Sequence, residues 1–250
     1  MKQTKSFNIL LLGDNCNDVY HYGTVDRISP EAPVPIFKYK YQESKEGMAG
    51  NVLKNLQSLN CKVKFIPGNQ TSIKTRLIDI RTKQQLLRMD NDLESTPIDI
   101  SKIKDFNFDA IVVSDYNKGS IAYETITRLR SVYFGPIFLD TKKTDLNKFN
   151  NIFVKINEVE YNNLKSFNNT LIVTLGNKGA MFKTHNEFFF ETDNVEVSDV
   201  CGAGDTFLSA LTYQYLVSNN IESAIKFANK AASITVQHIG NYAPTLNEII

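Results

Sequence analysis

The feature that most constrains the fold is a series of short apolar runs, each ending at a small or polar residue. Five such runs occupy residues 8–12, 110–113, 137–139, 152–156 and 171–173. Continuous apolar runs of this length, separated by segments of helical period, are typical of parallel strands buried on both faces of a sheet. Ligands of open α/β sheets bind beyond the carboxyl ends of the strands, so the five runs predict one shared crevice.

The segments between these runs divide into helical and extended types. We predict helices over residues 50–59, 122–129 and 221–235, another helix after Asp205, and a strand over residues 62–66. Residues 34–41 and 76–89 are rich in β-forming residues and lack a helical stripe. We interpret each of these two segments as an antiparallel strand of a small sheet that projects from the main domain. Such a sheet covers a crevice or pairs with a partner strand across a dimer.

The composition excludes several classes of protein. Hydrophobic residues make up 42% of the 250 residues, which is enough for a buried core and unlike a disordered chain. The net charge of +1, without a basic block, leads us to expect no nucleic-acid partner. Cys16, Cys61 and Cys201 are too widely spaced for a disulfide framework or a CxxC metal pair. No apolar run is long enough for a signal sequence or a membrane span, so we expect a cytoplasmic protein without a membrane partner.

The strongest chemical signal is a glycine-rich turn, Gly202-Ala203-Gly204-Asp205, that opens into a predicted helix. Glycines let backbone N–H groups turn toward an anion, and a helix N-terminus adds unpaired donors and the positive end of its dipole. This arrangement suits a phosphoryl group in transfer, and Asp205 in the same turn suits a proton acceptor for an attacking hydroxyl. The alternative is a glycine turn in which Asp205 only caps the helix.

The same turn resembles the signature of the ribokinase-like (PfkB) sugar kinases. Further stretches, in the same order along the chain, resemble one branch of that family, the kinases of D-glycero-β-D-manno-heptose 7-phosphate. These stretches are residues 13–20, 27–35, 84–90, 114–119 and 140–142. The resemblance implies one kinase domain over residues 1–250, folded as a three-layer α/β sandwich with a mostly parallel central sheet. It also implies a small projecting β-sheet lid, with strands from about residues 18–45 and 74–90.

The resemblance assigns roles to the residues that match the family motifs. The expected catalytic residues are Asp205, as general base, and the anion hole formed by the backbone of Gly202, Ala203 and Gly204. Asn157 and Glu160 resemble the Asn-x-x-Glu element that organises magnesium, water and phosphate, with Glu160 reaching Mg²⁺ through water. The rest of the expected nucleotide site consists of Thr174, Gly176, Gly179 and Asn229.

On the sugar side, the resemblance places Asp18, Gly47 and Asn51 at positions that hold substrate hydroxyls. A substrate that already carries a phosphate needs a cationic pocket. The candidate ligands for that phosphate are the cationic residues in the matching stretches: Arg76, Arg88, Lys118 and Lys142, with Lys74 beside them. The alternative for each of these cations is a solvated surface position.

Three departures from the family pattern stand out. Met48 follows Gly47 where a second glycine is usual, which adds a side chain at the sugar site, and Cys201 replaces the usual threonine before the anion hole. The chain is also shorter than the pattern between residues 68 and 74 and between residues 160 and 171, so peripheral elements are missing. Their loss leaves an apolar face for association to cover, and we expect a homodimer formed through the lid sheet.

The leading hypothesis is a kinase that transfers the γ-phosphoryl group of ATP to a phosphorylated sugar. The expected sugar is D-glycero-β-D-manno-heptose 7-phosphate, converted to the 1,7-bisphosphate. Mg²⁺ is the expected cofactor, and the resemblance leaves a monovalent cation open. Two alternatives remain: a PfkB-family kinase for another sugar or nucleoside, and a trimmed homologue that binds a sugar phosphate or a nucleotide without catalysis.

Overall fold

The computed structural model of this chain describes residues 5–167 and 170–250. Within these residues, 10 strands form one sheet in the order β10-β9-β8-β7-β6-β5-β1-β3-β4, with β2 paired to β1. The strands are β1 (Asn8–Ile28), β2 (Pro35–Met48), β3 (Lys62–Asp79), β4 (Gln85–Asn91), β5 (Ala110–Asp115), β6 (Ile137–Thr141), β7 (Phe153–Asn157), β8 (Leu171–Thr174), β9 (Ala180–Lys183) and β10 (Glu187–Phe190). Along the series β3, β1, β5, β6, β7 and β8, each strand runs parallel to the next. This confirms a mostly parallel central sheet. Strands β2, β4, β9 and β10 run antiparallel to their neighbours.

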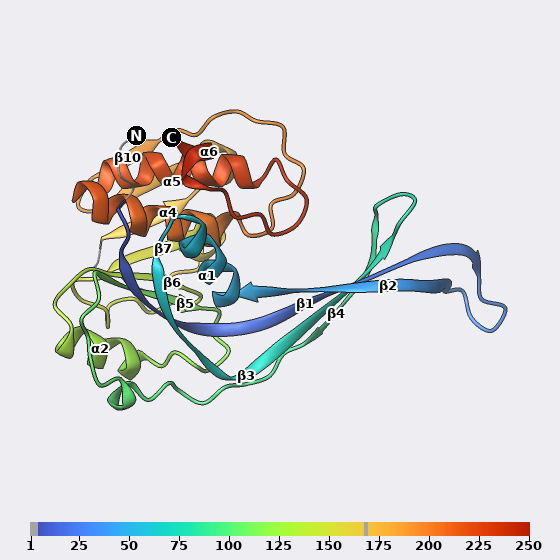
Figure 1. Cartoon of the computed structure of the whole chain (residues 1–250), viewed down its shortest axis with the longest axis horizontal. Helices are drawn as coiled ribbons and strands as arrows, with labels where there is room; N and C mark the ends of the chain where they lie inside the picture. Colours follow the sequence, from blue (N-terminus) through green and yellow to red (C-terminus); the bar gives the residue numbers. More distant parts are fainter. Residues whose placement is uncertain (1–4, 168–169) are drawn as a thin grey trace.

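Helices cover both faces of this sheet (Figure 1). They are α1 (Ala49–Ser58), α2 (Tyr123–Val132), α3 (Glu158–Asn162), α4 (Ala203–Ser218), α5 (Ile221–Thr235) and α6 (Leu246–Ile249), with the short 3₁₀ helices η1 (Ile100–Lys102) and η2 (Gly176–Lys178). The alternation of side chains along each strand divides the core between the two faces. In β1, Ile9 and Leu11 pack with α1, α4 and α5, whereas Leu10 and Leu12 pack with α2 and η1. The three-layer α/β sandwich is therefore confirmed.

The two longest strands leave the body and form a projecting arm, visible on the right of Figure 1. Residues 9–13 of β1 pair with β5 inside the body, and from Asn15 onward β1 pairs with β2. Strand β3 stays beside β1 along both parts and carries β4 on its outer edge. We call the lid the four-stranded sheet made of β2, β4, residues 15–28 of β1 and residues 71–79 of β3.

The lid differs from the sequence prediction in one respect. Residues 76–89 were predicted as one strand, and this is wrong: β3 ends at Asp79 and β4 begins at Gln85. The Asp79 carboxylate accepts hydrogen bonds from the backbone N–H groups of Arg81 (2.8 Å) and Thr82 (3.2 Å), and Lys83 has a φ of 58°. This side-chain-capped turn closes a hairpin inside a segment whose composition indicates continuous strand. The predicted strand over residues 62–66 is the first part of the much longer β3.

In the described part of the chain, no helix is both long enough and apolar enough to cross a membrane.

Candidate active site

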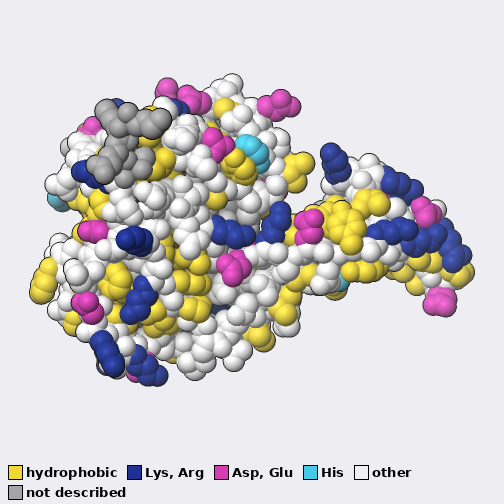
Figure 2. All heavy atoms as spheres, in the orientation of Figure 1, with side chains coloured by type: hydrophobic (Ala, Val, Ile, Leu, Met, Phe, Trp, Pro, Cys, Tyr) yellow, Lys and Arg dark blue, Asp and Glu magenta, His cyan; other side chains and the backbone are white. Residues whose placement is uncertain are grey.

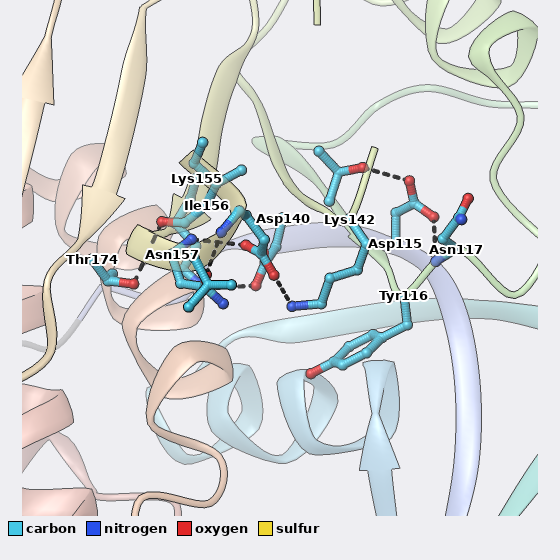
Figure 3. A network of polar contacts seen from close by, with 12 residues as sticks. Asp115, Tyr116, Asn117, Asp140, Lys142, Lys155, Ile156, Asn157 and Thr174 are labelled. Carbon is cyan, nitrogen blue, oxygen red and sulfur yellow. Dashed lines mark hydrogen bonds and ion pairs between the residues drawn. The ribbon is translucent and has the colours of Figure 1, made fainter. Parts of the chain in front are cut away.

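Two adjoining cavities lie beyond the carboxyl ends of β5 to β8, where the sequence predicts a shared crevice. The first has a volume of about 380 Å³, and the second of about 210 Å³. Thr174, Gly176, Val200 and Gly204 line both cavities, so the two meet at the turn that begins α4. Figure 3 shows the side chains that the strand ends bring to this place.

The glycine-rich turn has the geometry expected of an anion-binding loop. Gly202 has a φ of 78°, a left-handed conformation that L side chains rarely adopt, and α4 starts at Ala203. Among the described residues, no acceptor is placed for the backbone N–H groups of Gly202, Gly204 and Asp205, and the amide of Ala203 makes only a 3.4 Å contact with the Val200 carbonyl. The open donors of the first turn thus border the 380 Å³ cavity.

Asp205 is buried at the same point, and two side chains fix its carboxylate. Asn51 Nδ2 donates to Oδ2 at 2.8 Å, and the Tyr116 hydroxyl donates to Oδ1 at 2.9 Å. Burial is the main cause that raises the pKa of Asp205 to about 6, with a further contribution from the charge of Asp140. A carboxylate with this pKa is ionised at neutral pH and takes up a proton more readily than an exposed aspartate.

A buried ion pair that the sequence prediction missed lies against the turn. Lys155 Nζ is 2.8 Å from Asp140 Oδ2, and both side chains are at least 90% buried (Figure 3). Burial alone lowers the pKa of Lys155, but the charge and hydrogen bond of Asp140 outweigh it, so the pKa is raised and the ammonium stays charged. A Cβ atom on Gly204 would lie 3.0 Å from Lys155 Nζ, so any larger residue there would press against the ammonium. A lysine within the apolar run 152–156 was the available signal.

Asn157 and Glu160 form a reciprocal pair at the start of α3. The Glu160 N–H donates to Asn157 Oδ1, and the Asn157 N–H donates to Glu160 Oε2, both at 2.8 Å. The other oxygen of Glu160 holds the ammonium of Lys142. The predicted Asn-x-x-Glu residues are therefore together beside the first cavity, and Lys142, predicted to bind substrate, is ion-paired with one of them.

The predicted nucleotide residues also come together. Thr174, Gly176, Gly179 and Asn229 all line the 210 Å³ cavity, whose other walls are mostly apolar side chains of the 192–200 segment and of α4 and α5. Gly179 has a φ of 88°, and a Cβ there would lie 2.1 Å from the Phe190 carbonyl oxygen, so only glycine fits. The Asn229 side chain donates to the Phe190 carbonyl at 2.8 Å and anchors the end of β10.

On the sugar side, the lid brings Asp18 and Arg76 into a largely buried ion pair, in which the two side chains are 8% and 12% exposed. The carboxylate of Asp18 lies over Gly47, where a Cβ atom would be 2.3 Å from Oδ2. Of the three residues predicted to hold substrate hydroxyls, Asn51 contacts Asp205 directly, whereas Asp18 and Gly47 lie against each other on the lid. Met48, the unusual residue beside Gly47, is 4% exposed and has a φ of 52° at the start of α1, a backbone conformation that glycine adopts without strain.

Two predicted cations lie apart from this cluster. Arg88 forms a two-point ion pair with Asp90, with both contacts at 2.7 Å, on the solvent-exposed strand β4. The Lys118 ammonium pairs with Asp92. Neither Arg88 nor Lys118 lines the two cavities. Each has an acidic neighbour close in the folded chain, which the sequence prediction did not consider.

The loop that carries Tyr116 and Lys118 is organised by a residue that the sequence prediction did not select, Asp14. Its buried carboxylate accepts hydrogen bonds from the N–H groups of Tyr116 (2.8 Å), Lys118 (3.0 Å) and Ser120 (3.2 Å), and from the Ser120 hydroxyl. The position of Asp14 directly after an apolar run was the available signal.

A third cavity, of about 620 Å³, lies between the lid and the 198–201 and 239–240 segments. Its lining combines the aromatic rings of Tyr20, Tyr22 and Tyr41 with Arg76 and Lys83. Tyr22 and Tyr41 stack with ring centroids 4.8 Å apart, and the Arg76 guanidinium lies 5.2 Å from the centre of the Tyr20 ring. The lid thus presents an aromatic and basic face to the body.

Comparison with known proteins agrees with this architecture. The model of the pfkB family carbohydrate kinases matches residues 154–248, which include most of β7, the Asn157–Glu160 pair and the glycine-rich turn. Bifunctional protein HldE of Helicobacter acinonychis is 31% identical over 302 aligned positions, which cover 96% of this chain and 65% of that protein. Because this chain has only 250 residues, the alignment contains gaps, consistent with the shortened segments described above.

Solved structures of ribokinases share the fold. The ribokinase of Thermotoga maritima superposes with a TM-score of 0.70 at 17% identity, covering 97% of this chain and 98% of that one. The ribokinase of Arabidopsis thaliana complexed with ribose and ATP superposes with a TM-score of 0.71 at 14% identity, covering 98% of both chains. This chain is therefore similar to the pfkB family carbohydrate kinases over residues 154–248 and to bifunctional protein HldE over most of its length, and it shares the fold of the ribokinases.

Proposed function

We propose that this chain transfers the γ-phosphoryl group of ATP to a hydroxyl of a phosphorylated sugar. The observation that supports this most directly is the placement of Asp205 beside the open backbone donors of Gly202 and Gly204, at the junction of two cavities. One cavity is mainly apolar and suits a nucleotide base. The other is polar and suits the phosphates and the acceptor hydroxyl.

In the proposed reaction, the sugar hydroxyl attacks the γ-phosphorus, the bond from this phosphorus to the bridging oxygen breaks, and ADP leaves. Asp205 takes the proton of the hydroxyl. The transition state of such a transfer is loose and spreads charge over the equatorial oxygens, so catalysis depends on position and on electrostatic stabilisation. The amides of the α4 turn and the ammonium of Lys155 supply that stabilisation from fixed positions.

The donor set at Asn157 and Glu160 fits the expected Mg²⁺. No group of three or more His, Cys, Asp or Glu side chains is arranged to hold a metal in the described part of the chain. Mg²⁺ in kinases needs only one or two carboxylates, because substrate phosphates and water complete its shell. In this structure the Glu160 carboxylate accepts the Asn157 N–H and pairs with the Lys142 ammonium, so Mg²⁺ would take the place of that ammonium. When bound, Mg²⁺ would neutralise phosphate charge, and Glu160 would hold it through water. A monovalent cation stays a prediction from the family resemblance.

The proposed acceptor is D-glycero-β-D-manno-heptose 7-phosphate, giving the 1,7-bisphosphate. Its support is the set of motifs shared with that branch of the family and the 31% identity to bifunctional protein HldE. The chain also has cations on the acceptor side, because Lys74 and Arg76 lie two positions apart on β3, both beside Asp18. Arg and Lys in a partly buried position recognise phosphate well.

An assay of ADP release over a panel of sugar phosphates, free sugars and nucleosides tests this proposal, with Asp205→Asn as the catalytic control. Turnover with heptose 7-phosphate that falls about 10²–10⁴-fold in the variant supports it. Turnover with another acceptor favours a PfkB kinase of different specificity. Binding of sugar phosphate or nucleotide by calorimetry, without turnover, favours a non-catalytic homologue.

We also propose that two copies of the chain associate through the lid. The pairing register places Tyr20, Arg76 and Arg88 on the face toward the body, so the neighbouring positions face outward. Apolar side chains on that outer face are well exposed: Tyr39 by 54%, Leu87 by 48%, Met89 by 50% and Ile73 by 39%. Figure 2 shows apolar and basic side chains gathered on the arm.

Light scattering at micromolar concentration should give the mass of a dimer, and the double variant Leu87→Lys with Met89→Lys should give the mass of a monomer. A monomeric wild type would contradict this proposal.

A further inference from the structure

One side chain at the centre of the site has no part in the proposed reaction. Tyr116 follows β5 and lines the 380 Å³ cavity, and its hydroxyl donates to Asp205 Oδ1 at 2.9 Å. The Tyr116 backbone is fixed as well, because its N–H donates to the buried carboxylate of Asp14 at 2.8 Å. The residue is thus held at both ends, and within the described part of the chain its hydroxyl makes one hydrogen bond, to the proposed base.

Two ammonium groups also lie against the ring of Tyr116. Lys74 Nζ, from β3, lies 5.9 Å from the ring centre, and Lys142 Nζ, from the segment after β6, lies 5.4 Å from it. Cations at these distances are attracted to the electron-rich face of an aromatic ring. Lys74 forms no salt bridge with another of the described residues, and its ammonium lies over the Tyr116 ring. The ring therefore has a defined orientation.

The hydroxyl is suited to donate and not to accept. Burial raises the pKa of Tyr116 well above its usual value, and the charge of Asp205 raises it further, so the phenol keeps its proton. A hydrogen bond donated to a carboxylate favours the charged form. Together with Asn51 on Oδ2, Tyr116 fixes the plane of the carboxylate and leaves its remaining lone pairs for the substrate hydroxyl.

We propose that Tyr116 is a positioning residue that aims the carboxylate of Asp205 and keeps it ionised for proton acceptance. This inference rests on the proposed function, because it gives Asp205 the task of a base. The hydroxyl of Tyr116 itself does not contact the phosphoryl group or the substrate in this role.

The charged and titratable groups around Asp205 come from four elements. They are Cys16 from β1, Asp140 from β6, Lys155 from β7 and Tyr116 from the segment after β5, with the neutral Asn51 from α1. Asp140 raises the pKa of Asp205, whereas Lys155, Asn51 and Tyr116 lower it. Removing the Tyr116 hydroxyl takes away one lowering contribution and leaves the others, so the pKa of Asp205 rises.

The first test is the pH profile of kcat for Tyr116→Phe, which retains the ring and loses only the hydroxyl. We expect the acid limb to move up by about one pH unit, so that kcat falls about tenfold below the wild-type midpoint and recovers at high pH, with KM for the sugar changed less. The matched control is Tyr133→Phe, which loses a hydrogen bond to the Phe108 carbonyl (3.0 Å) far from the cavities. An acid limb that overlays that of the wild type overturns the inference.

The second test measures the same ionisation without turnover. In protein labelled with ¹³C at the aspartate carboxyl groups, the Asp205 resonance is assigned by its loss in Asp205→Asn and then titrated. We expect its midpoint to be higher in Tyr116→Phe than in the wild type and in Tyr133→Phe. Equal midpoints reject the inference whatever the activity. A raised midpoint in a chain without ADP release with any acceptor rejects the proposed function and leaves the link between Tyr116 and Asp205 supported.

Discussion

Replacing Lys155 with methionine removes the ammonium beside the α4 turn while keeping most of the side-chain volume. The change leaves the Asp140 carboxylate, 8% exposed, buried without its cation. Breaking a buried ion pair in this way costs about 3–5 kcal/mol of unfolding free energy. The fixed charge beside the Gly204 amide is also lost, and removing one such stabilising group from a site of charge development lowers kcat by about 10²–10³-fold.

A double variant separates the two effects. Lys155→Met with Asp140→Leu replaces the whole pair by apolar groups, which is often neutral or stabilising, so urea unfolding should return close to the wild-type midpoint. The catalytic loss should remain. The matched control is Lys143→Met, which breaks a second buried pair, Lys143 Nζ to Asp115 Oδ2 at 3.0 Å, outside both cavities. This control should lose stability and retain kcat.

The measurements are kcat from ADP release and the free energy of unfolding from urea titration, on the same preparations. If the double variant unfolds at the wild-type midpoint and turns over at the wild-type rate, Lys155 contributes only to folding and the electrostatic argument is refuted. If Lys143→Met lowers kcat as much as Lys155→Met does, the loss reflects stability and not local charge.

Three further perturbations follow from the site. Asp205→Asn should lower kcat by about 10²–10⁴-fold. Because burial raises the pKa of Asp205 from 3.8 to about 6, the stability of the wild type falls as the pH rises from about 4 to about 6 and stays lower above it. This variant should therefore gain up to about 3 kcal/mol in urea unfolding at pH 8 and nothing below pH 4. An unchanged pH dependence of stability would contradict the burial argument. Gly47→Ala places a Cβ 2.3 Å from Asp18 Oδ2 and should raise KM for the sugar much more than KM for ATP in steady-state assays; equal changes would argue against a sugar-side role. Asp14→Ala leaves four donors of the 116–120 loop without their acceptor and should lower the free energy of unfolding by at least about 3 kcal/mol, measured with urea; a smaller loss would mean that water replaces the carboxylate.

The sequence predicts those parts of the fold that depend on local pattern. The strands around residues 9–12 and 110–113 were predictable because buried parallel strands need continuous apolar runs, and α5 because its small and apolar residues recur at helical spacing. The hairpin at residues 80–84 was not, because the turn depends on the Asp79 carboxylate folding back onto two backbone N–H groups. Composition alone does not distinguish such a carboxylate from a strand residue.

The same division holds for the site. The turn at Gly202 and the pair Asn157–Glu160 were predictable because their chemistry needs fixed residue types at short spacing. Lys155 and Tyr116 depend on partners far along the chain: Asp140 is 15 residues from Lys155, and Asp205 is 89 residues from Tyr116. Whether a lysine in an apolar run is paired, and with which acid, is decided by the order of strands in the sheet.

The continuity of β1 and β3 determines how the projecting arm can move. Both strands pass from the packed interior to the arm without an intervening loop, and their pairing shifts register between Gly13 and Asn15, where the two regions meet. No flexible linker joins the arm to the body. A displacement of the arm therefore has to bend β1 and β3 at the point where their register shifts. Asp14, which anchors the 116–120 loop, lies at the same point of the chain. A bend of the arm at this point would therefore be passed on to that loop and, through Tyr116, to Asp205.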